Sequence, residues 1–265
     1  MTATEAPRPS RRRVRQRVRR RRSRGLTPLF VVGELLVTAG VVLGLFVVWN
    51  LVWTDYEAGQ EQRAALERLE ESWTVPDSSA DDADADGDQP VSAEPGEGDP
   101  PAVSRADDGE PFARLHVPRW GADHALPIRE GSAMSVINTG AAGRYSETQM
   151  PGEMGNFAIG AHRQSYGAAF RHIDALELGD RLIVRSAQAW FVYEVTETRI
   201  VQPHQVEVLA PVPGQVGAEA NGRYITLTTC HPLWSTAERY IVHGELAEWY
   251  PFSADLPEHL LVSDE

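Results

Sequence analysis

Apolar residues are concentrated in one long run near the N-terminus. Residues from Leu29 to Trp53 are apolar almost without interruption, which is long enough for a helix to cross a bilayer with some tilt. Trp49 and Trp53 lie where an interfacial aromatic belt is expected. The run is longer than the apolar core of a signal peptide, and no Ala-X-Ala cleavage site closes it. The pattern therefore predicts a transmembrane helix over 29–53.

The two segments that follow are polar and differ from each other. Over 54–76, Leu66, Leu69 and Trp73 recur at helical spacing, which predicts a helical stalk, with weak self-association as the alternative. Residues 77–110 are rich in Asp, Glu, Pro, Gly, Ser and Ala. Such a segment buries too little apolar surface to offset its ordering entropy, so we expect a disordered acidic linker. A chain that starts near Glu110 is then expected to fold and to act on a soluble peptide.

Short alternating runs fill residues 111–250. The expected strands are 113–117, 125–128, 156–162, 181–186, 189–201, 224–230 and 239–246, with another short element at 205–209. Turn signals separate them, and 133–138 and 170–176 are expected to be short helical pieces. Many short strands with turns between them predict a mainly β domain, an antiparallel barrel or sandwich. Residues 251–265 are expected to form a short charged tail.

Charge is divided unevenly along the chain. The first 25 residues carry eleven Arg and one Glu, so the total of −13 conceals a strongly acidic remainder. An Arg run can be a nucleic-acid-binding arm. Because an apolar span follows it here, we interpret residues 1–28 as a cytoplasmic tail that keeps the N-terminus inside and directs the C-terminus outward. No nucleic-acid partner is expected, and the absence of Lys from the sequence excludes Lys-based catalysis.

The single cysteine, Cys230, is the first candidate for chemistry. It lies in the alternating stretch Tyr224–Pro232, which predicts a strand that ends near Pro232, a residue with no N–H for the ladder. A lone cysteine is commonly a small buried hydrophobe. Outside the membrane, however, cysteines are usually paired, so an unpartnered one can also be a reactive thiol. His162 and Arg239 lie at the ends of two other predicted strands.

These three residue types match the needs of acyl transfer. A thiolate attacks a carbonyl, an imidazole takes and returns a proton, and a guanidinium stabilises the oxyanion. We therefore expect Cys230 as nucleophile, His162 as acid/base, and Arg239 as oxyanion and substrate clamp. His231 should point to the opposite face of the strand from Cys230. The other histidines lack metal-ligand spacing and the acidic run 81–88 lacks the closing Glu of an EF-hand, so no metal or cofactor is expected.

The motif around the cysteine resembles that of a known family, the sortases. Thr226-Leu227-Thr228-Thr229-Cys230 is similar to the sortase signature Thr-Leu-X-Thr-Cys, and His162 and Arg239 fit the family's catalytic set. The stretch Met150–Asn156 and the pair Tyr166-Gly167 resemble class E, the actinobacterial housekeeping type. The resemblance covers roughly Phe112 to Trp249.

This resemblance implies a closed antiparallel β-barrel of about eight strands with short helices, a catalytic domain over 111–250, and one N-terminal transmembrane helix. It implies that Thr228 and Thr229 line the substrate groove. Tyr166 is expected either to contact the sorting peptide or to pack against its neighbours.

The implied function is transpeptidation at the outer face of the plasma membrane. The enzyme would cleave a Leu-Ala-X-Thr-Gly or Leu-Pro-X-Thr-Gly sorting signal between Thr and Gly through a Cys230 thioester. It would then join the secreted protein to an amine of a peptidoglycan precursor. Two alternatives remain open. A non-catalytic, membrane-tethered β-barrel that binds ligands would not need Cys230, and a cysteine peptidase that only hydrolyses would ignore an added amine.

Overall fold

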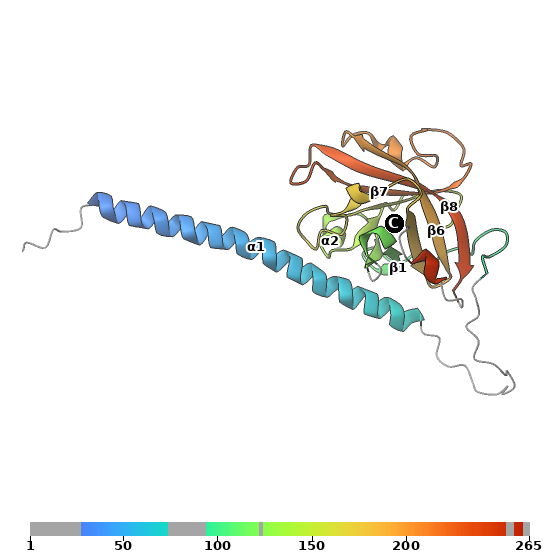
Figure 1. Cartoon of the computed structure of the whole chain (residues 1–265), viewed down its shortest axis with the longest axis horizontal. Coiled ribbons are helices and arrows are strands. Elements are labelled where there is room, and N and C mark those ends of the chain that lie inside the picture. Colours follow the sequence, from blue (N-terminus) through green and yellow to red (C-terminus); the bar gives the residue numbers. More distant parts are fainter. Residues whose placement is uncertain (1–27, 74–93, 122–123, 253–256, 262–265) are drawn as a thin grey trace, which may run out of the picture. The chain divides into compact units, whose positions relative to one another are not determined.

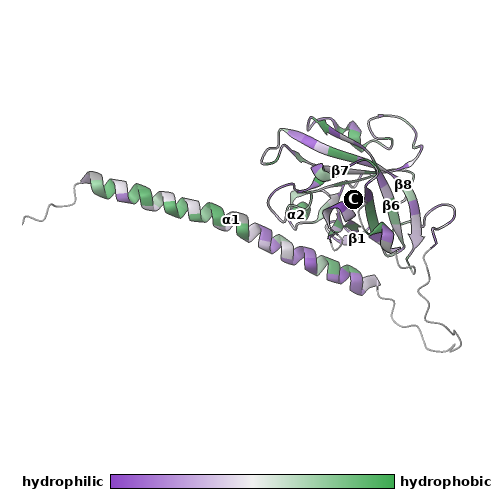
Figure 2. Cartoon of the chain, in the orientation of Figure 1, coloured by the Kyte–Doolittle hydropathy of each residue, from purple (hydrophilic) through white to green (hydrophobic). Residues whose placement is uncertain are grey.

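The computed structural model describes residues 28–73, 94–121, 124–252 and 257–261. Its first element is one continuous helix, α1 (Pro28–Trp73), so the predicted span over 29–53 and the predicted stalk join without a break. Among the described residues, α1 is the one helix long and apolar enough to cross a membrane, and Figure 2 shows its first part mostly green. The predicted cytoplasmic tail lies outside the described residues up to position 27.

Contacts divide the chain into two compact units, 1–47 and 48–265. In the first unit, the apolar side chains of α1 are exposed. In the second, α1 has one buried stripe, formed by Ala58, Ala65, Leu69 and Trp73. Their spacings of seven, four and four residues return to the same helical face. The amphipathic pattern that the sequence indicates through Leu69 and Trp73 is therefore used to pack the helix within this unit.

Eight strands close into a barrel within the described part of the chain (Figure 1). They are β1 (Pro111–His116), β2 (Ala125–Glu130), β3 (Ala142–Arg144), β4 (Gly155–Gly160), β5 (Arg181–Ser186), β6 (Ala189–Val201), β7 (Arg223–His231) and β8 (Glu238–Pro251). Their order around the barrel is β1-β2-β3-β4-β7-β8-β6-β5. The predicted closed barrel is confirmed. It is not antiparallel throughout, because β2 pairs with β3 and β4 pairs with β7 in parallel.

Short helical pieces lie between the strands and, in one case, after the last strand. They are the 3-10 helices η1 (Pro118–Trp120), η2 (Ile173–Ala175), η3 (Val206–Leu209) and η4 (Glu258–Leu260), together with α2 (Met134–Ile137). The predicted helix at 170–176 is thus reduced to η2. Strand β3 was not predicted, because Ala-Gly-Arg offers no apolar alternation over three residues.

The barrel interior is filled by apolar and aromatic side chains. Phe112 of β1 and Phe157 of β4 meet edge to face, with ring centroids 6.5 Å apart. Both belong to one continuous core with Phe191, Ile225 and Val242. The longest ladder joins β6 and β8 and contains two register shifts, which let these long strands bend around the core.

Both segments that flank the predicted catalytic domain carry contacts to the barrel. Residues 77–93 of the predicted linker lie outside the described residues. Residues 94–110 contact the barrel at a few points, and most of their side chains are exposed. Val103 is buried in the main core, and the amide of Gly96 donates to the carbonyl of Trp249 (2.7 Å). In the predicted tail, Leu260 is buried against Trp190. Structured packing therefore begins before residue 111 and continues past 250, which the acidic composition of these segments concealed.

Candidate active site

One cavity of about 470 Å³ is lined by Cys230, His162 and Arg239 together. Cys230 comes from the end of β7, Arg239 from the start of β8, and His162 from the segment directly after β4. The cavity is also lined by Thr228, Thr229 and Tyr166. The structure thus brings all six residues that the sequence nominates to one place.

Strand register places two of the three catalytic candidates. Cys230 and Arg239 are directly opposite each other in the antiparallel ladder of β7 and β8. On the other side of β7, Gly160 of β4 is in register with Thr228. The amide of Ala161 donates to the carbonyl of Thr228 (3.2 Å), which extends this parallel pairing past the end of β4. Continued in the same register, this pairing places His162 next to Cys230.

The neighbouring histidine, His231, belongs to a different environment. Its Nδ1 accepts a hydrogen bond from Nη1 of Arg163 (2.9 Å), and its ring lies against Tyr240. It does not line the cavity that holds Cys230. Arg163 is itself buried and forms an ion pair with Asp174 (2.6 Å). Strand alternation separates His231 from Cys230, as the sequence predicts, and Arg163 anchors the backbone next to His162.

The imidazole of His162 is held by Asn138 and Tyr166. Its Nε2 lies 2.8 Å from Oδ1 of Asn138, the residue that ends α2. An amide oxygen only accepts hydrogen bonds, so Nε2 carries the proton and Nδ1 keeps a lone pair. Tyr166 stacks on the ring at a centroid distance of 5.3 Å. Burial lowers the pKa of His162 below its ordinary value of 6.5, which favours the neutral form at pH 7.

The loop after His162 has an unusual backbone. Ser165, Tyr166 and Ala168 have φ values of 61°, 50° and 44°, and Gly167 between them has 76°. Each non-glycine residue in this left-handed region costs about 1–3 kcal/mol, so such a run persists only where its surroundings hold it. The ring of Tyr166 packs on the imidazole and also lines the cavity, so its position is compatible with both packing and contact with a peptide.

The remaining cavity residues have distinct hydrogen bonds. Arg239 donates from Nη1 to the carbonyls of Thr236 (3.0 Å) and Glu238 (2.9 Å), which orients its guanidinium. The hydroxyl of Thr229 donates to the carbonyl of Ala161 (2.7 Å) and so joins β7 to the end of β4. The hydroxyl of Thr228 lies 2.8 Å from Oη of Tyr145. Thr228, Thr229 and Tyr145 all line the cavity, and Thr229 also ties β7 to the end of β4.

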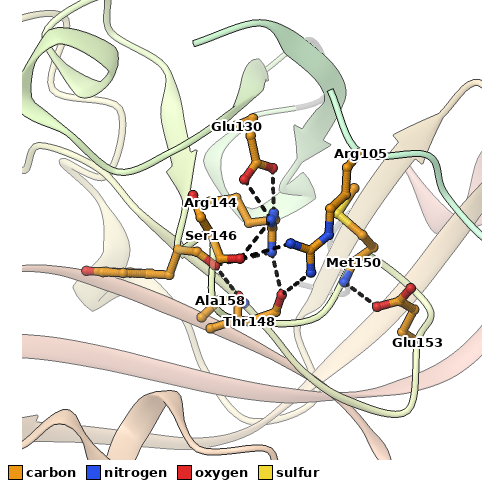
Figure 3. A network of polar contacts seen from close by, with 9 residues as sticks. Arg105, Glu130, Arg144, Ser146, Thr148, Met150, Glu153 and Ala158 are labelled. Carbon is orange, nitrogen blue, oxygen red and sulfur yellow. Dashed lines mark hydrogen bonds and ion pairs between the residues drawn. The ribbon is translucent and has the colours of Figure 1, made fainter. Parts of the chain in front are cut away.

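A buried ion pair fixes the loop that carries Tyr145 (Figure 3). The guanidinium of Arg144 is fully buried and donates two hydrogen bonds of 2.7 Å to the carboxylate of Glu130. It also donates to the carbonyls of Tyr145, Ser146 and Thr148. Breaking a buried pair by removing one partner typically costs about 3–5 kcal/mol. The buried pair of Arg144 and Glu130 therefore stabilises the cavity wall at Tyr145.

A second cavity adjoins the first. It has a volume of about 630 Å³ and shares Ser132 and Tyr145 with the cavity of Cys230. Its far side is formed by Val206, Leu209 and other residues around η3. None of the three catalytic candidates lines it, so the candidate site is the smaller of these two cavities. Among the described residues, no cluster of His, Cys, Asp or Glu has a metal-binding arrangement.

Two residues of the site, Asn138 and Tyr145, were missed from the sequence. Asn138 follows a helix of only four residues, and Tyr145 follows a strand of only three. Neither lies in a motif or in a periodic run, so the sequence carries no local signal for them.

Comparison with known proteins identifies relatives of the whole β-domain. A family model described as "Sortase domain" matches residues 115–247. Sortase SrtE1 of Streptomyces coelicolor is 36% identical over 237 residues, and the alignment covers 87% of this chain and 60% of the relative. Sortase SrtE2 of the same organism is 36% identical over 225 residues, with 82% and 81% covered. The chain thus spans three fifths of the first relative and four fifths of the second.

Solved structures agree with this similarity. The SrtA sortase from Actinomyces oris is 42% identical, with a TM-score of 0.61, 65% of this chain covered and 98% of the other. Sortase E1 from Streptomyces coelicolor, solved with a tripeptide in the active site, is 38% identical, with a TM-score of 0.53 and coverage of 59% and 99%. Class E sortases are therefore among the relatives in both sequence and fold, as the motif comparison indicates.

Proposed function

The chain belongs to the sortase family, a family of transpeptidases, and we propose that it is a membrane-anchored cysteine transpeptidase acting on sorting signals. The observation that carries this proposal is the single cavity lined by Cys230, His162 and Arg239. A peptide held in the active site of the related sortase E1 supports a peptide substrate. The proposed substrate is a Leu-Ala-X-Thr-Gly or Leu-Pro-X-Thr-Gly signal, cleaved between Thr and Gly.

In the first half of the proposed reaction, Sγ of Cys230 attacks the Thr carbonyl. The thiol proton passes to Nδ1 of His162, the nitrogen left free by the contact of Nε2 with Asn138. Arg239 stabilises the oxyanion with its fixed guanidinium. When the amide C–N bond breaks, His162 returns the proton to the departing amine of Gly, and a Thr–Cys230 thioester remains.

In the second half, a primary amine of a peptidoglycan precursor attacks the thioester. Its nitrogen forms an amide with the Thr carbonyl, and Cys230 leaves as a thiolate. The proton released by the amine returns to the Cys230–His162 pair. The enzyme is regenerated, and the secreted protein is attached to the precursor.

The test uses the full chain in detergent micelles with a peptide that contains the sorting signal. Intact mass spectrometry should detect an acyl adduct on Cys230, because the proposed reaction passes through a thioester between the Thr carbonyl and this thiol. Added peptidoglycan-type amine should convert the adduct into a peptide–amine product. If the peptide is only hydrolysed at the same rate with and without amine, the protein is a peptidase. If Cys230 is never acylated and the peptide stays intact, the proposal fails.

We further propose that the N-terminus is cytoplasmic and that the barrel lies outside the cell. The support is the Arg-rich sequence before the apolar part of α1. Protease added to intact, wall-stripped cells should then remove the chain beyond Asp77. Full protection of the barrel under these conditions would contradict both the orientation and the proposed substrates.

A further inference from the structure

The second half of α1 contacts two segments that supply the surroundings of His162. Oδ1 of Asp55 accepts a hydrogen bond from the amide of Gly167 (3.0 Å). Nε2 of Gln62 donates one to the carbonyl of Gly140 (2.5 Å). Gly167 follows Tyr166, which stacks on the imidazole, and Gly140 lies two residues after Asn138, which binds its Nε2. One face of one helix therefore binds both of these backbone segments.

Glycine at both contact points allows the helix to approach this closely. A Cβ atom on Gly140 would lie 2.8 Å from Nε2 of Gln62, nearer than real Cβ contacts. A Cβ atom on Gly167 would lie 3.2 Å from the same nitrogen and 3.3 Å from Cβ of Ala58. Both glycines also have positive φ, 79° and 76°, which glycine adopts at little cost. The two loops are thus shaped to receive α1.

The loop after His162 needs such a contact. Ser165, Tyr166 and Ala168 all have positive φ, and the bond from Gly167 to Asp55 lies in the middle of this strained run. A backbone of this kind relaxes unless neighbouring contacts hold it. Because Tyr166 covers the imidazole, relaxation of the loop would displace the ring of His162.

The helix has its own anchors farther along. Ala65 and Leu69 are buried, and the carboxylate of Glu70 binds Nη1 of Arg114 on β1 (2.8 Å). These contacts do not involve the loop of His162. They hold α1 on the barrel independently, so the helix can support the loop instead of being carried by it.

We propose that Asp55 and Gln62 are positioning residues, which hold the His162 imidazole in its working position through Gly167 and Gly140. This inference rests on the proposed function, because it assumes that His162 is the acid/base. The helix next to the membrane span is then a working part of the active site. A chain that begins near Glu110 keeps Cys230 and Arg239 on their strands but lacks this support of His162, so the proposal predicts lower activity for it than for the full chain.

The kinetic test compares three variants of the full chain in detergent micelles. Asp55→Ala removes the acceptor, Asp55→Asn keeps an acceptor oxygen without the charge, and Glu67→Ala changes an exposed carboxylate on the same helix. For peptide cleavage, kcat of Asp55→Ala should fall about tenfold, the usual effect of a lost hydrogen bond to a charged group. KM should change less than about twofold. Asp55→Asn and Glu67→Ala should stay within about twofold of the unchanged protein.

A second measurement does not depend on activity. Hydrogen–deuterium exchange over residues 163–170 should be faster in Asp55→Ala, since the Gly167 amide loses its acceptor, and unchanged in Asp55→Asn and Glu67→Ala. If the protein without substitutions neither forms a thioester nor cleaves peptide, the proposed function is refuted. The exchange measurement would still show whether α1 holds the loop after His162.

Several results would overturn the positioning role. These are unchanged exchange in Asp55→Ala, unchanged kcat in that variant, or an equal loss in Asp55→Asn. If Asp55→Ala lowers the melting temperature, Gln62→Met is the deciding variant, because it keeps the length of the side chain and replaces the amide that donates to Gly140 with an apolar thioether. Gln62→Met should also lower kcat severalfold at an unchanged melting temperature. Full activity of Gln62→Met in that case contradicts the proposal.

Discussion

Cys230 and Arg239 face each other across a hydrogen-bonded pair of strands, whereas His162 lies on a loop. The strand side of the cavity is β7 and β8, nine and fourteen residues long, in continuous register through both side chains. The loop side is the segment after β4, which has positive φ at Ser165, Tyr166 and Ala168. It depends on contacts from Asn138 and from α1.

This difference separates two requirements of the proposed reaction. A nucleophile and an oxyanion donor must not move, and a barrel ladder supplies that rigidity at each residue. A proton carrier must serve the thiol and then the leaving amine, and a loop held by a few side chains allows such adjustment. Loss of a catalytic group on the strand side should therefore reduce the rate more than loss of a supporting contact on the loop side, which should weaken it by steps.

The largest effect is expected from Cys230→Ala. Since the chain has no other thiol and no Lys, neither an acyl adduct nor a peptide–amine product should form, as measured by intact mass and chromatography. His231→Gln is the matched control, because His231 is adjacent in sequence but does not line the cavity; its activity should stay within about threefold. Product formation by Cys230→Ala would show that the strand side does not hold the nucleophile.

Arg239→Lys should have the next largest effect. It keeps the positive charge but loses the planar fork that is oriented by Thr236 and Glu238. Loss of one oxyanion donor lowers kcat by about 10²–10³ in other enzymes, and we expect a loss of that order with an unchanged melting temperature. A variant within about threefold of the unchanged protein would mean that Arg239 acts only as a point charge, and a variant that unfolds would make it a structural residue.

The residues on the strand side of the cavity were also predicted better from the sequence than those on the loop side. The alternation of Tyr224–Cys230 and the position of Pro232 gave the bounds of β7 almost to the residue. The same alternation separated Cys230 from His231. These predictions were possible because side chains in a strand alternate with a period of two, a pattern that is visible in neighbouring residues of the sequence. Each catalytic candidate also lies at one end of such an alternating run.

The loop side was only partly predictable. His162 was nominated from the strand before it, but Asn138, Gly167 and the docking of α1 were not. Ser165, Tyr166 and Ala168 have positive φ but are not glycines, so their residue types do not indicate a turn at this position. The contact between Asp55 and Gly167 joins positions 112 residues apart, and a single sequence contains no record of such a pairing.

Asn138→Leu should have a smaller effect than either strand substitution. Leu has a similar size but offers no acceptor to Nε2 of His162, so the tautomer and the orientation of the ring are less well defined. We expect kcat to fall about tenfold, in line with the loss of one partly buried hydrogen bond, while acylation still occurs on Cys230. Ser135→Ala is the control, because Ser135 is exposed on the same short helix. A loss as large as that of Arg239→Lys would mean that both sides are equally rigid.

The smallest effect is a displacement of the pH profile. Burial lowers the pKa of His162 from 6.5, and the proposed base is the neutral imidazole. As pH falls through that pKa the ring becomes protonated, so kcat should decline with a midpoint below 6.5.

In Asn138→Asp a carboxylate replaces the amide, stabilises the imidazolium and raises the pKa of His162, so the acidic limb of the pH profile should move to higher pH. Asn138→Leu carries no charge and should not produce this upward movement. Rates should be compared only where circular dichroism shows both variants folded. An acidic limb that is the same in Asn138→Asp and Asn138→Leu would mean that the imidazole beside Asn138 is not the group that titrates, and His162 would lose its assignment as the base.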